Sequence, residues 1–492
     1  MDLRLVMGIS KLVRAYFRSL GEDCMRLLKV RLVLGLFILL MAPSAWASAL
    51  KAGVAKADIT PPPGLPLWGY ELREATGTLD PLFARVLVLE VGEKRVAIVA
   101  LDLGRTFGLP SIEQIRAAAR KSSGISYVLV CATHDHSAPA IRDSYPDGPP
   151  AWEKAALDKI EKAIAEAHDH AVEVRLGTGY GDAYVGHNRR RLNPNGTVTW
   201  FDKNETQIPT APVDPTVSIL RIDTLDGNPL AIVVNYACHP VVFGSDNRQY
   251  SADYPAAMVK AVEGAFGGKP LCLFLQGAAG DINPFYTAVP LQQDAIKRRD
   301  WEGAQLGNVA AHIAGEIHTE SPPIPSIDFA EDMLTFHFRW NVEKFRKAFF
   351  QGSEVGTDSA AAYYYAPPTD PEQHLPVATL LLNKKVAFMS MPGEPFVEFQ
   401  VNWRQRCPVQ DCFFLGYANG YFGYLPTIRA STEGGYGAAS TSTWIEPGAG
   451  ERMVDHAVLK VYEMLGLLSD GPENPDEDYT QTRPRAAVTD DH

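Results

Sequence analysis

Short runs of apolar, β-branched residues alternate with amphipathic helical patterns along most of the chain, and this alternation restricts the fold more than any other feature. Predicted strands are Arg85–Glu90, Val96–Leu101, Ser126–Cys131, Val217–Ile222, Leu230–Tyr236, Leu271–Leu275, Met333–Phe338 and Lys385–Met389. Predicted helices are Ser111–Lys121, Trp152–His168, Asp253–Ala265, Ala304–His318, Glu394–Arg406 and Arg452–Leu467, with Ser111 and Asp253 as N-caps. The pattern predicts an α/β fold with a mixed central β-sheet flanked by helices, in a single large domain.

Composition excludes several classes of protein. Of the 492 residues, 46% are hydrophobic and 21% are charged, which is typical of a globular protein and not of a disordered one. The net charge of −12 argues against a nucleic-acid partner, which would need a basic face.

The two ends of the sequence differ from the rest. Basic residues at 26–31 precede an apolar run at 32–41 and small residues at 45–49, so residues 1–49 are predicted to be a signal peptide. Residues 1–24 are interpreted as an over-extended start before Met25, and an uncleaved anchor is the alternative to a signal peptide. The segment 469–492 is rich in Pro, Asp and Glu and is predicted to be a disordered acidic tail. The protein is therefore expected to be secreted or periplasmic, with its domain at 50–468.

Export would affect the cysteines. Cys131, Cys238 and Cys272 lie in apolar strand-like runs and are predicted to be packed thiols. Cys407 and Cys412 are five residues apart, and an oxidising compartment would allow a small disulfide loop between them.

The clearest chemical motif is Cys131-Ala-Thr-His134-Asp-His136-Ser-Ala-Pro139, which directly follows an apolar strand. Residues two apart in an extended chain project to the same face, so the two imidazoles can converge on one point. Such a pair suits a metal such as zinc. The alternative is a pair of ordinary hydrogen-bonded histidines at a strand end.

Three more predicted strands are followed by segments that contain polar residues. They lead into His239, into the glycine-rich segment that contains Asp281, and into Met391-Pro-Gly-Glu394-Pro395. Ligands in open α/β sheets gather at the carboxyl ends of strands, which favours one shared site. Taken singly, these residues also fit a structural histidine, an Asp-capped turn and a first-turn helix acid.

In order and spacing, these motifs resemble the zinc-dependent catalytic domain of the neutral/alkaline, non-lysosomal ceramidases. The resemblance extends from about Gly53 to about Tyr462. Its other segments are Gly53-Val-Ala-Lys-Ala-Asp58-Ile-Thr60-Pro61, Trp68-Gly69-Tyr70, Phe83-Ala84-Arg85, Asp102, Asn188-Arg189, Ser251-Ala-Asp253-Tyr254, Gly280-Asp281-Ile-Asn283-Pro284, Asn419-Gly-Tyr421-Phe-Gly-Tyr424 and Tyr436-Gly-Ala-Ala-Ser440-Thr441.

The resemblance implies a role for each matched residue. It implies one zinc ion per chain, and the implied ligands are His134, His239, Glu394 and Tyr424. It leaves open whether Ca²⁺ or Mg²⁺ also binds. The substrate site is implied to be lined by His136, Arg189 and Tyr436.

This set of residue types suits amide hydrolysis. A mixed N/O zinc site lowers the pKa of a bound water towards about 7. The amide carbonyl would be polarised by zinc and by Tyr436 or Arg189, and the leaving amine would be protonated by His136 or Asp281. The predicted function is that of a secreted, ceramidase-like zinc amidohydrolase acting on ceramide or a related N-acylated lipid. A lipid substrate would require transient contact with a membrane surface, and the oligomeric state stays open.

Two departures from the family leave the substrate open. Asn283 replaces the serine of the family's Gly-Asp-x-Ser-Pro motif, which excludes a serine nucleophile at this position. Typical members also continue into an immunoglobulin-like domain, which is expected to be missing here.

Other functions compete with this prediction. They are a zinc-dependent esterase, lactonase or phosphodiesterase on the same core, and an exported binding protein whose metal site has decayed. Retention of all four ligand types counts against the decayed site. The order of the motifs fits a TIM-barrel amidohydrolase less well. A metallo-β-lactamase is disfavoured because no Asp-His pair follows His136-Ser137 at the expected offset.

Overall fold

The computed structural model describes residues 48–468, except 72, 146 and 352–369. The predicted signal peptide, up to residue 47, and the predicted acidic tail lie outside these residues. The chain divides into two units, Met1–Ser48 and Ala49–His492, and the second contains every element below. Within the described ranges, none of the helices combines the length and apolar character needed to cross a bilayer.

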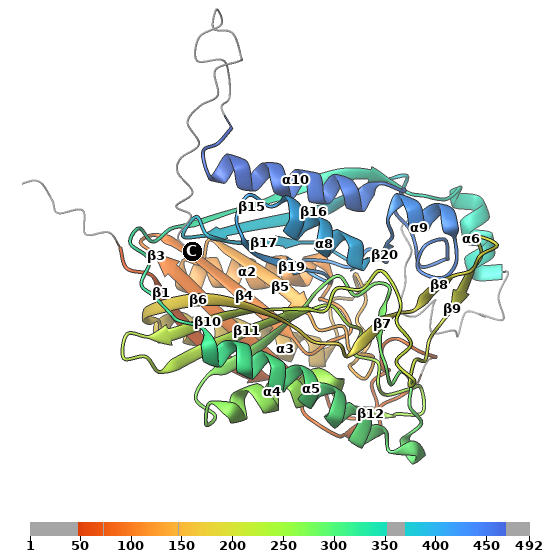
Figure 1. Ribbon diagram of the computed structural model, residues 1–492, viewed down its shortest axis with the longest axis horizontal. Helices are drawn as coiled ribbons and strands as arrows, with labels where there is room; N and C mark the ends of the chain where they lie inside the picture. Colours follow the sequence, from red (N-terminus) through yellow and green to blue (C-terminus); the bar gives the residue numbers. More distant parts are fainter. Residues whose placement is uncertain (1–47, 72, 146, 352–369, 469–492) are drawn as a thin grey trace, which may run out of the picture. The chain divides into compact units, whose positions relative to one another are not determined.

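The larger of the two main sheets has eight strands (Figure 1). Their order across the sheet is β13 (Leu271–Gln276), β11 (Pro229–Tyr236), β10 (Thr216–Thr224), β6 (Val172–Asp182), β1 (Lys51–Asp58), β3 (Phe83–Val91), β4 (Lys94–Leu101) and β5 (Tyr127–Ala132). The pairs at the two edges, β11 with β13 and β4 with β5, are parallel, and the inner pairs are antiparallel. The sheet is therefore mixed, as predicted.

The smaller sheet has four strands, in the order β15 (Ile327–His337), β16 (Glu372–Leu382), β17 (Val386–Ser390) and β19 (Asp411–Leu415), with β17 and β19 parallel. Apolar side chains from both sheets share one core, which includes Leu129 of the larger sheet and Phe388 of the smaller one. The sheets therefore pack face to face, an arrangement that strand periodicity did not predict.

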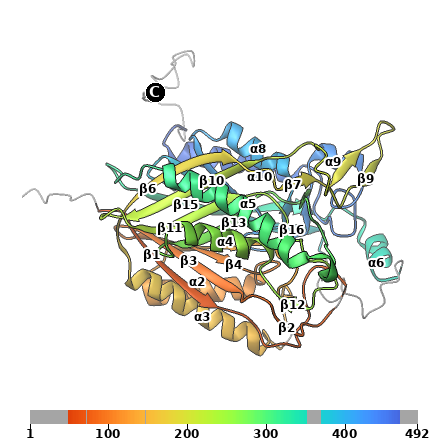
Figure 2. The same cartoon turned by 60° about the horizontal axis from the view of Figure 1, so that its bottom comes forward.

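Helices cover the outer face of each sheet. On the larger sheet these are α2 (Leu109–Ser123), α3 (Ala151–Asp169), α4 (Asp253–Ala265) and α5 (Ala295–Glu316) (Figure 2). On the smaller sheet they are α8 (Val397–Arg406) and α10 (Ala449–Met464). The result is four layers, helix, sheet, sheet and helix. The fold class predicted from sequence is confirmed.

Short elements complete the described part of the fold. They are the helices α6 (Val342–Gln351), α9 (Ile428–Glu433) and η1 (Leu291–Gln293), and the strand pairs β2 (Gly77–Thr78) with β12 (Gln249–Tyr250), β7 (Gly186–Asn188) with β14 (Ile282–Pro284), β8 (Arg190–Leu192) with β9 (Val198–Trp200), and β18 (Glu394–Pro395) with β20 (Tyr424–Leu425).

Three β-α-β units, β4-α2-β5, β11-α4-β13 and β17-α8-β19, place the carboxyl ends of their strands together. Each joins two parallel strands through a helix. Asn235 of β11 donates from Nδ2 to the carbonyls of Leu275 in β13 and Phe414 in β19, both at 2.8 Å. The amide of Ala132 donates to the carbonyl of Tyr417, just after β19, at 3.0 Å. Backbone and amide hydrogen bonds thus connect the strand ends of the two sheets.

Four long strands, β1, β6, β16 and β19, were not among the predicted ones. The sequence of β6, Val-Glu-Val-Arg-Leu-Gly-Thr-Gly-Tyr-Gly-Asp, has glycines where apolar side chains would signal a strand. A Cβ on Gly179 would come within 2.8 Å of the Ile317 side chain. Glycine therefore lets the end of α5 and the residue after it pack against β6.

Four predictions at helix starts are wrong. The helix predicted from Ala304 already begins at Ala295. Ser111 is not the N-cap of α2, because the helix already begins at Leu109, next to Pro110, and Gly108 is the cap. Asp253 is the first residue of α4, not its N-cap, which is Ala252. The helix predicted from Glu394 begins at Val397, because Glu394 and Pro395 form strand β18.

The predictions for the cysteines are confirmed for the packed thiols but not for the disulfide. Cys131, Cys238 and Cys272 are buried free thiols. Cys407 and Cys412 are both free, and the Cys412 thiol donates to the Val409 carbonyl at 2.9 Å. The disulfide that the spacing allows is therefore absent from the structure.

Asp253 makes the stability of the fold depend on pH. Its carboxylate accepts hydrogen bonds from the amides of Phe243 (3.0 Å) and Tyr254 (2.6 Å), but burial raises its pKa from 3.8 to about 6. Between these two values the folded state keeps a proton that the unfolded state has lost, so this group lowers the free energy of unfolding as pH rises, by at most about 3 kcal/mol. We expect Asp253→Asn to reduce this decline in urea unfolding of the metal-free protein between pH 4 and pH 6. Asp226→Asn, at an exposed turn, is the matched control, and an equal decline in wild type and Asp253→Asn would contradict the prediction.

Candidate metal centre

His134 is the second residue after β5. Its Nδ1 lies 2.5 Å from the Gly104 carbonyl, so Nδ1 holds the proton and Nε2 has the free lone pair. That Nε2 is buried and has no hydrogen-bond partner among the residues that the structure describes. The residue has a φ of 70°, a costly conformation for a residue other than glycine and one often found at functional sites.

His239 has the same arrangement at the end of β11. Its Nδ1 lies 2.6 Å from the Ala279 carbonyl and 3.1 Å from the Ile282 carbonyl, both in the glycine-rich loop after β13. Burial, together with nearby Arg189, lowers the pKa of His239 to about 3. The imidazole therefore stays neutral, with Nε2 available to bind a cation.

His136 completes a group of three histidines. One ring nitrogen from each of His134, His136 and His239 lies within 4.8 Å of the others. His136 is half-buried, whereas the other two are fully buried, and burial lowers its pKa well below the ordinary value. A Cβ on Gly69 would come within 2.4 Å of the His136 ring, so only glycine leaves room for this ring.

Glu394 supplies a carboxylate to the same place. Its Oε2 lies 3.1 Å from Nε2 of His239 and 3.4 Å from Nε2 of His134. Burial alone would raise the pKa of the Glu394 carboxyl, but His134 and His239 lower it by more. The pKa therefore lies well below its usual value. Neutral imidazoles around an ionised carboxylate are the donor types that zinc prefers. The structure therefore brings together three of the four ligands predicted from the sequence, together with His136.

Tyr424 is next to Glu394, because strands β18 and β20 pair in parallel with these two residues in register. Its hydroxyl accepts a hydrogen bond from Nη2 of Arg189 at 2.8 Å. Arg189 also donates to the Gly280 carbonyl (2.6 Å) and to Oδ1 of Asn283 (3.0 Å). The buried guanidinium is thus held by three hydrogen bonds, and the role of Tyr424 as a zinc ligand stays a prediction.

Tyr436 lies on the solvent side of Arg189. The residue is 49% exposed, and its ring packs against the rings of Tyr424 and Trp200, with centroids 5.4 Å and 4.7 Å away. The structure therefore brings Arg189, Tyr424 and Tyr436 together, which the sequence predicted only through resemblance.

Asp281 is held away from the histidines by its own hydrogen bonds. One carboxylate oxygen accepts from the amide of Val397, at the start of α8 (2.8 Å), and the other accepts from Nδ2 of Asn188 (2.7 Å). Burial raises the pKa of Asp281 to about 6. These contacts join the loop after β13 to α8 and β7, and the role of Asp281 as a proton donor stays a prediction.

Sequence reasoning missed three aromatic residues of the site. Tyr421 donates to Oε1 of Glu394 at 2.5 Å; it lies in the Asn-x-Tyr-x-x-Tyr segment, so its position was a usable signal. The Tyr417 ring stacks on His134 with centroids 4.1 Å apart, and the Trp200 ring lies 4.8 Å from Cζ of Arg189. No local pattern marks these last two residues.

Comparisons with known proteins agree with this fold. No family model matches the sequence. Among solved structures, the neutral ceramidase from Pseudomonas aeruginosa is similar, with a TM-score of 0.67 and 18% identity over 88% of this chain and 77% of that chain. A ceramidase complexed with C2 is also similar, with a TM-score of 0.66 and 17% identity over the same shares, 88% and 77%. The chain thus has the fold of the neutral ceramidases.

Proposed function

We propose that the protein is a zinc-dependent amidohydrolase that cleaves the N-acyl bond of ceramide or a related N-acylated lipid. The observation that supports this most is the buried Glu394 carboxylate between the Nε2 atoms of His134 and His239, 3.4 Å and 3.1 Å away. The shared fold adds support, because the similar solved proteins are ceramidases and one was solved complexed with C2.

The residues present fit a zinc ion. Both buried imidazoles direct Nδ1 to backbone carbonyls, which leaves Nε2 for a metal, and the Nε2 of His134 has no hydrogen-bond partner in the described part of the chain. We assign His134, His239, Glu394 and Tyr424 as the ligands. Zinc, when bound, supplies a Lewis acid that activates water and polarises the amide carbonyl at neutral pH.

The chain's own side chains would do the remaining work. Arg189 is held by three hydrogen bonds, so its positive charge is positioned in advance for the oxyanion that develops on the carbonyl oxygen. Tyr436, beside it, presents a half-exposed hydroxyl as a second donor. His136 is neutral, half-buried and without a partner for Nδ1 among the described residues, so it can take a proton from water and pass it to the leaving amine.

Hydrolysis of a fluorescent short-chain N-acylsphingosine tests the proposal, with the matched ester beside it. We expect cleavage of the amide to stop on chelation and to return with one zinc per chain. Cleavage of the ester alone would favour a zinc esterase or lactonase on this core. Zinc binding without cleavage of either compound would overturn the assignment to ceramide.

We also propose that the protein is exported through residues 1–49. We expect the protein recovered from the periplasm or medium to begin near residue 50, as read by N-terminal sequencing. Recovery of the intact N-terminus from a membrane fraction would instead support an uncleaved anchor.

A further inference from the structure

Asn283, which replaces the family's serine, connects two charged residues. Its Oδ1 accepts from Nη1 of Arg189 at 3.0 Å, and its Nδ2 donates to Oδ1 of Asp202 at 2.9 Å. Asn283 is buried, so the guanidinium on one side and the carboxylate on the other determine the orientation of its amide. A serine side chain is shorter and carries its donor and acceptor on one atom, so it would not span the distance between these two groups as the amide does.

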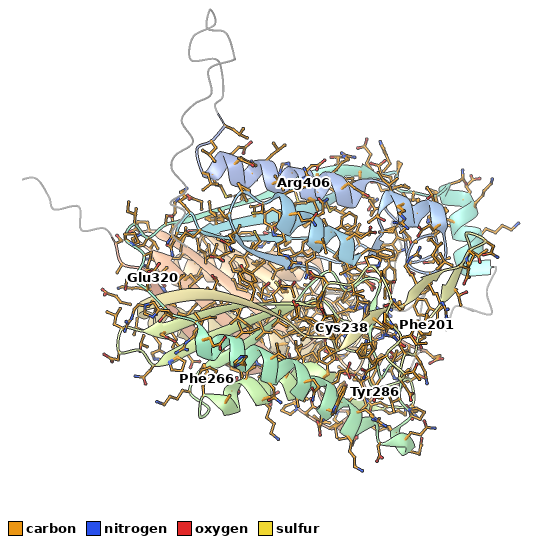
Figure 3. The ribbon with its side chains drawn as sticks, viewed as in Figure 1. Phe201, Cys238, Phe266, Tyr286, Glu320 and Arg406 are labelled. Carbon is orange, nitrogen blue, oxygen red and sulfur yellow. The ribbon has the colours of Figure 1, made fainter. Side chains whose placement is uncertain are left out.

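Backbone contacts hold Asp202 in this place. The amide of Phe201 donates to the Arg189 carbonyl at 2.7 Å, and Nε2 of His187 lies 2.8 Å from the Phe201 carbonyl. The hairpin β8–β9 therefore ends with Phe201 fixed on both sides and with Asp202 directed to Asn283. In Figure 3, Phe201 and Cys238, the residue before His239, lie toward one end of the strands and Glu320 lies at the other.

Among the described residues, the Asp202 carboxylate has no cationic partner. It forms no ion pair within residues 48–468 outside the undescribed gaps, and its other oxygen has no hydrogen bond there. The adjacent Lys203 donates to the Ala288 carbonyl instead. A partly exposed carboxylate that lacks a cation has unused capacity to accept hydrogen bonds.

Asp202 is also partly accessible to solvent. His134, His239, Glu394 and Arg189 are buried, whereas His136, Tyr70 and Asp202 are only half-buried. Tyr70 contacts the His136 ring, with centroids 5.0 Å apart. Solvent thus reaches Asp202, which is joined through Asn283 to the buried Arg189.

We propose that Asp202, positioned by Asn283, is a specificity residue that binds a hydrogen-bond donor on the amine side of the substrate and prefers an ammonium group to a hydroxyl group. The inference rests on the proposed amidohydrolase function and adds a substrate class to it. Both groups can donate a hydrogen bond to a carboxylate, but only an ammonium group adds the attraction between opposite charges.

Three matched amides test the inference, namely the dodecanamides of ethylenediamine, ethanolamine and propylamine. We expect kcat/KM in the wild type to fall in that order, with a ratio of roughly tenfold or more between the first and the last. Asp202→Asn is expected to reduce this ratio to within about twofold, and Asn283→Ser to reduce it less. Asp226→Asn makes the same charge change at an exposed turn and should keep the wild-type ratio.

Binding separates this inference from the proposed function. Binding of the three amides is measured by calorimetry on the zinc-depleted protein. Their affinities should fall in the same order as kcat/KM, and Asp202→Asn should remove most of the difference between them. Failure to hydrolyse any of them would overturn the amidohydrolase function, whereas the order of binding decides the role of Asp202. If Asp202→Asn lowers the affinity for all three amides equally, the inference is overturned, because Asp202 would then only position Arg189.

Discussion

Replacing His134 with alanine is expected to remove zinc and amidase activity together. The substitution deletes a buried Nε2 that lies 3.4 Å from Oε2 of Glu394 and has no other partner in the described structure. Loss of residues that only support metal ligands already lowers metal affinity or activity by about 10- to 100-fold, so the loss of a ligand should exceed about 100-fold. Zinc content by atomic absorption and kcat/KM on the N-acylsphingosine measure the two effects.

The control for His134→Ala is His312→Ala, since His312 is an exposed histidine on α5. His134 also stacks on Tyr417, so circular dichroism and thermal unfolding must show that the variant is folded. His134→Gln, which keeps more of the side-chain volume, provides a second variant. Stoichiometric zinc in a folded His134 variant would contradict the assignment of this residue as a ligand.

Arg189→Lys is expected to lower kcat by about 100- to 1000-fold while zinc stays bound. A lysine ammonium cannot reproduce the planar guanidinium, which donates at once to Gly280, Asn283 and Tyr424. Removing one donor that stabilises an oxyanion typically costs this much. Steady-state kinetics and zinc content, measured on the same preparation, test the prediction.

Arg429→Lys serves as the control, because Arg429 is exposed and pairs only with Glu433 in the described structure. Loss of zinc in Arg189→Lys would contradict the prediction. In that case the main role of Arg189 would be to hold Tyr424 for the metal, and not to stabilise the developing charge.

Local patterns singled out the central side chains as candidates, and only the resemblance to the ceramidases assigned roles to them. His134, His136, His239 and Glu394 each follow an apolar strand, and the structure confirms that they meet at the carboxyl ends of those strands. This succeeded because strand periodicity and the preference of zinc for imidazole and carboxylate are both visible in short segments of sequence. The helix starts at Ser111 and Asp253 failed, because the preference for a cap was outweighed by Pro110 in one case and by tertiary hydrogen bonds in the other.

Tertiary structure decided the contacts that join distant segments. Tyr417 reaches His134 only because the smaller sheet packs on the larger one, and Asp202 reaches Arg189 only through Asn283, 81 residues further along the chain. The types of candidate ligand and the strands that precede them follow from local sequence, since both depend on neighbouring residues. The residues that orient those side chains, such as Tyr417, depend on how the two sheets stack. So does the position of the Asp202 carboxylate. No periodicity along the chain records that packing.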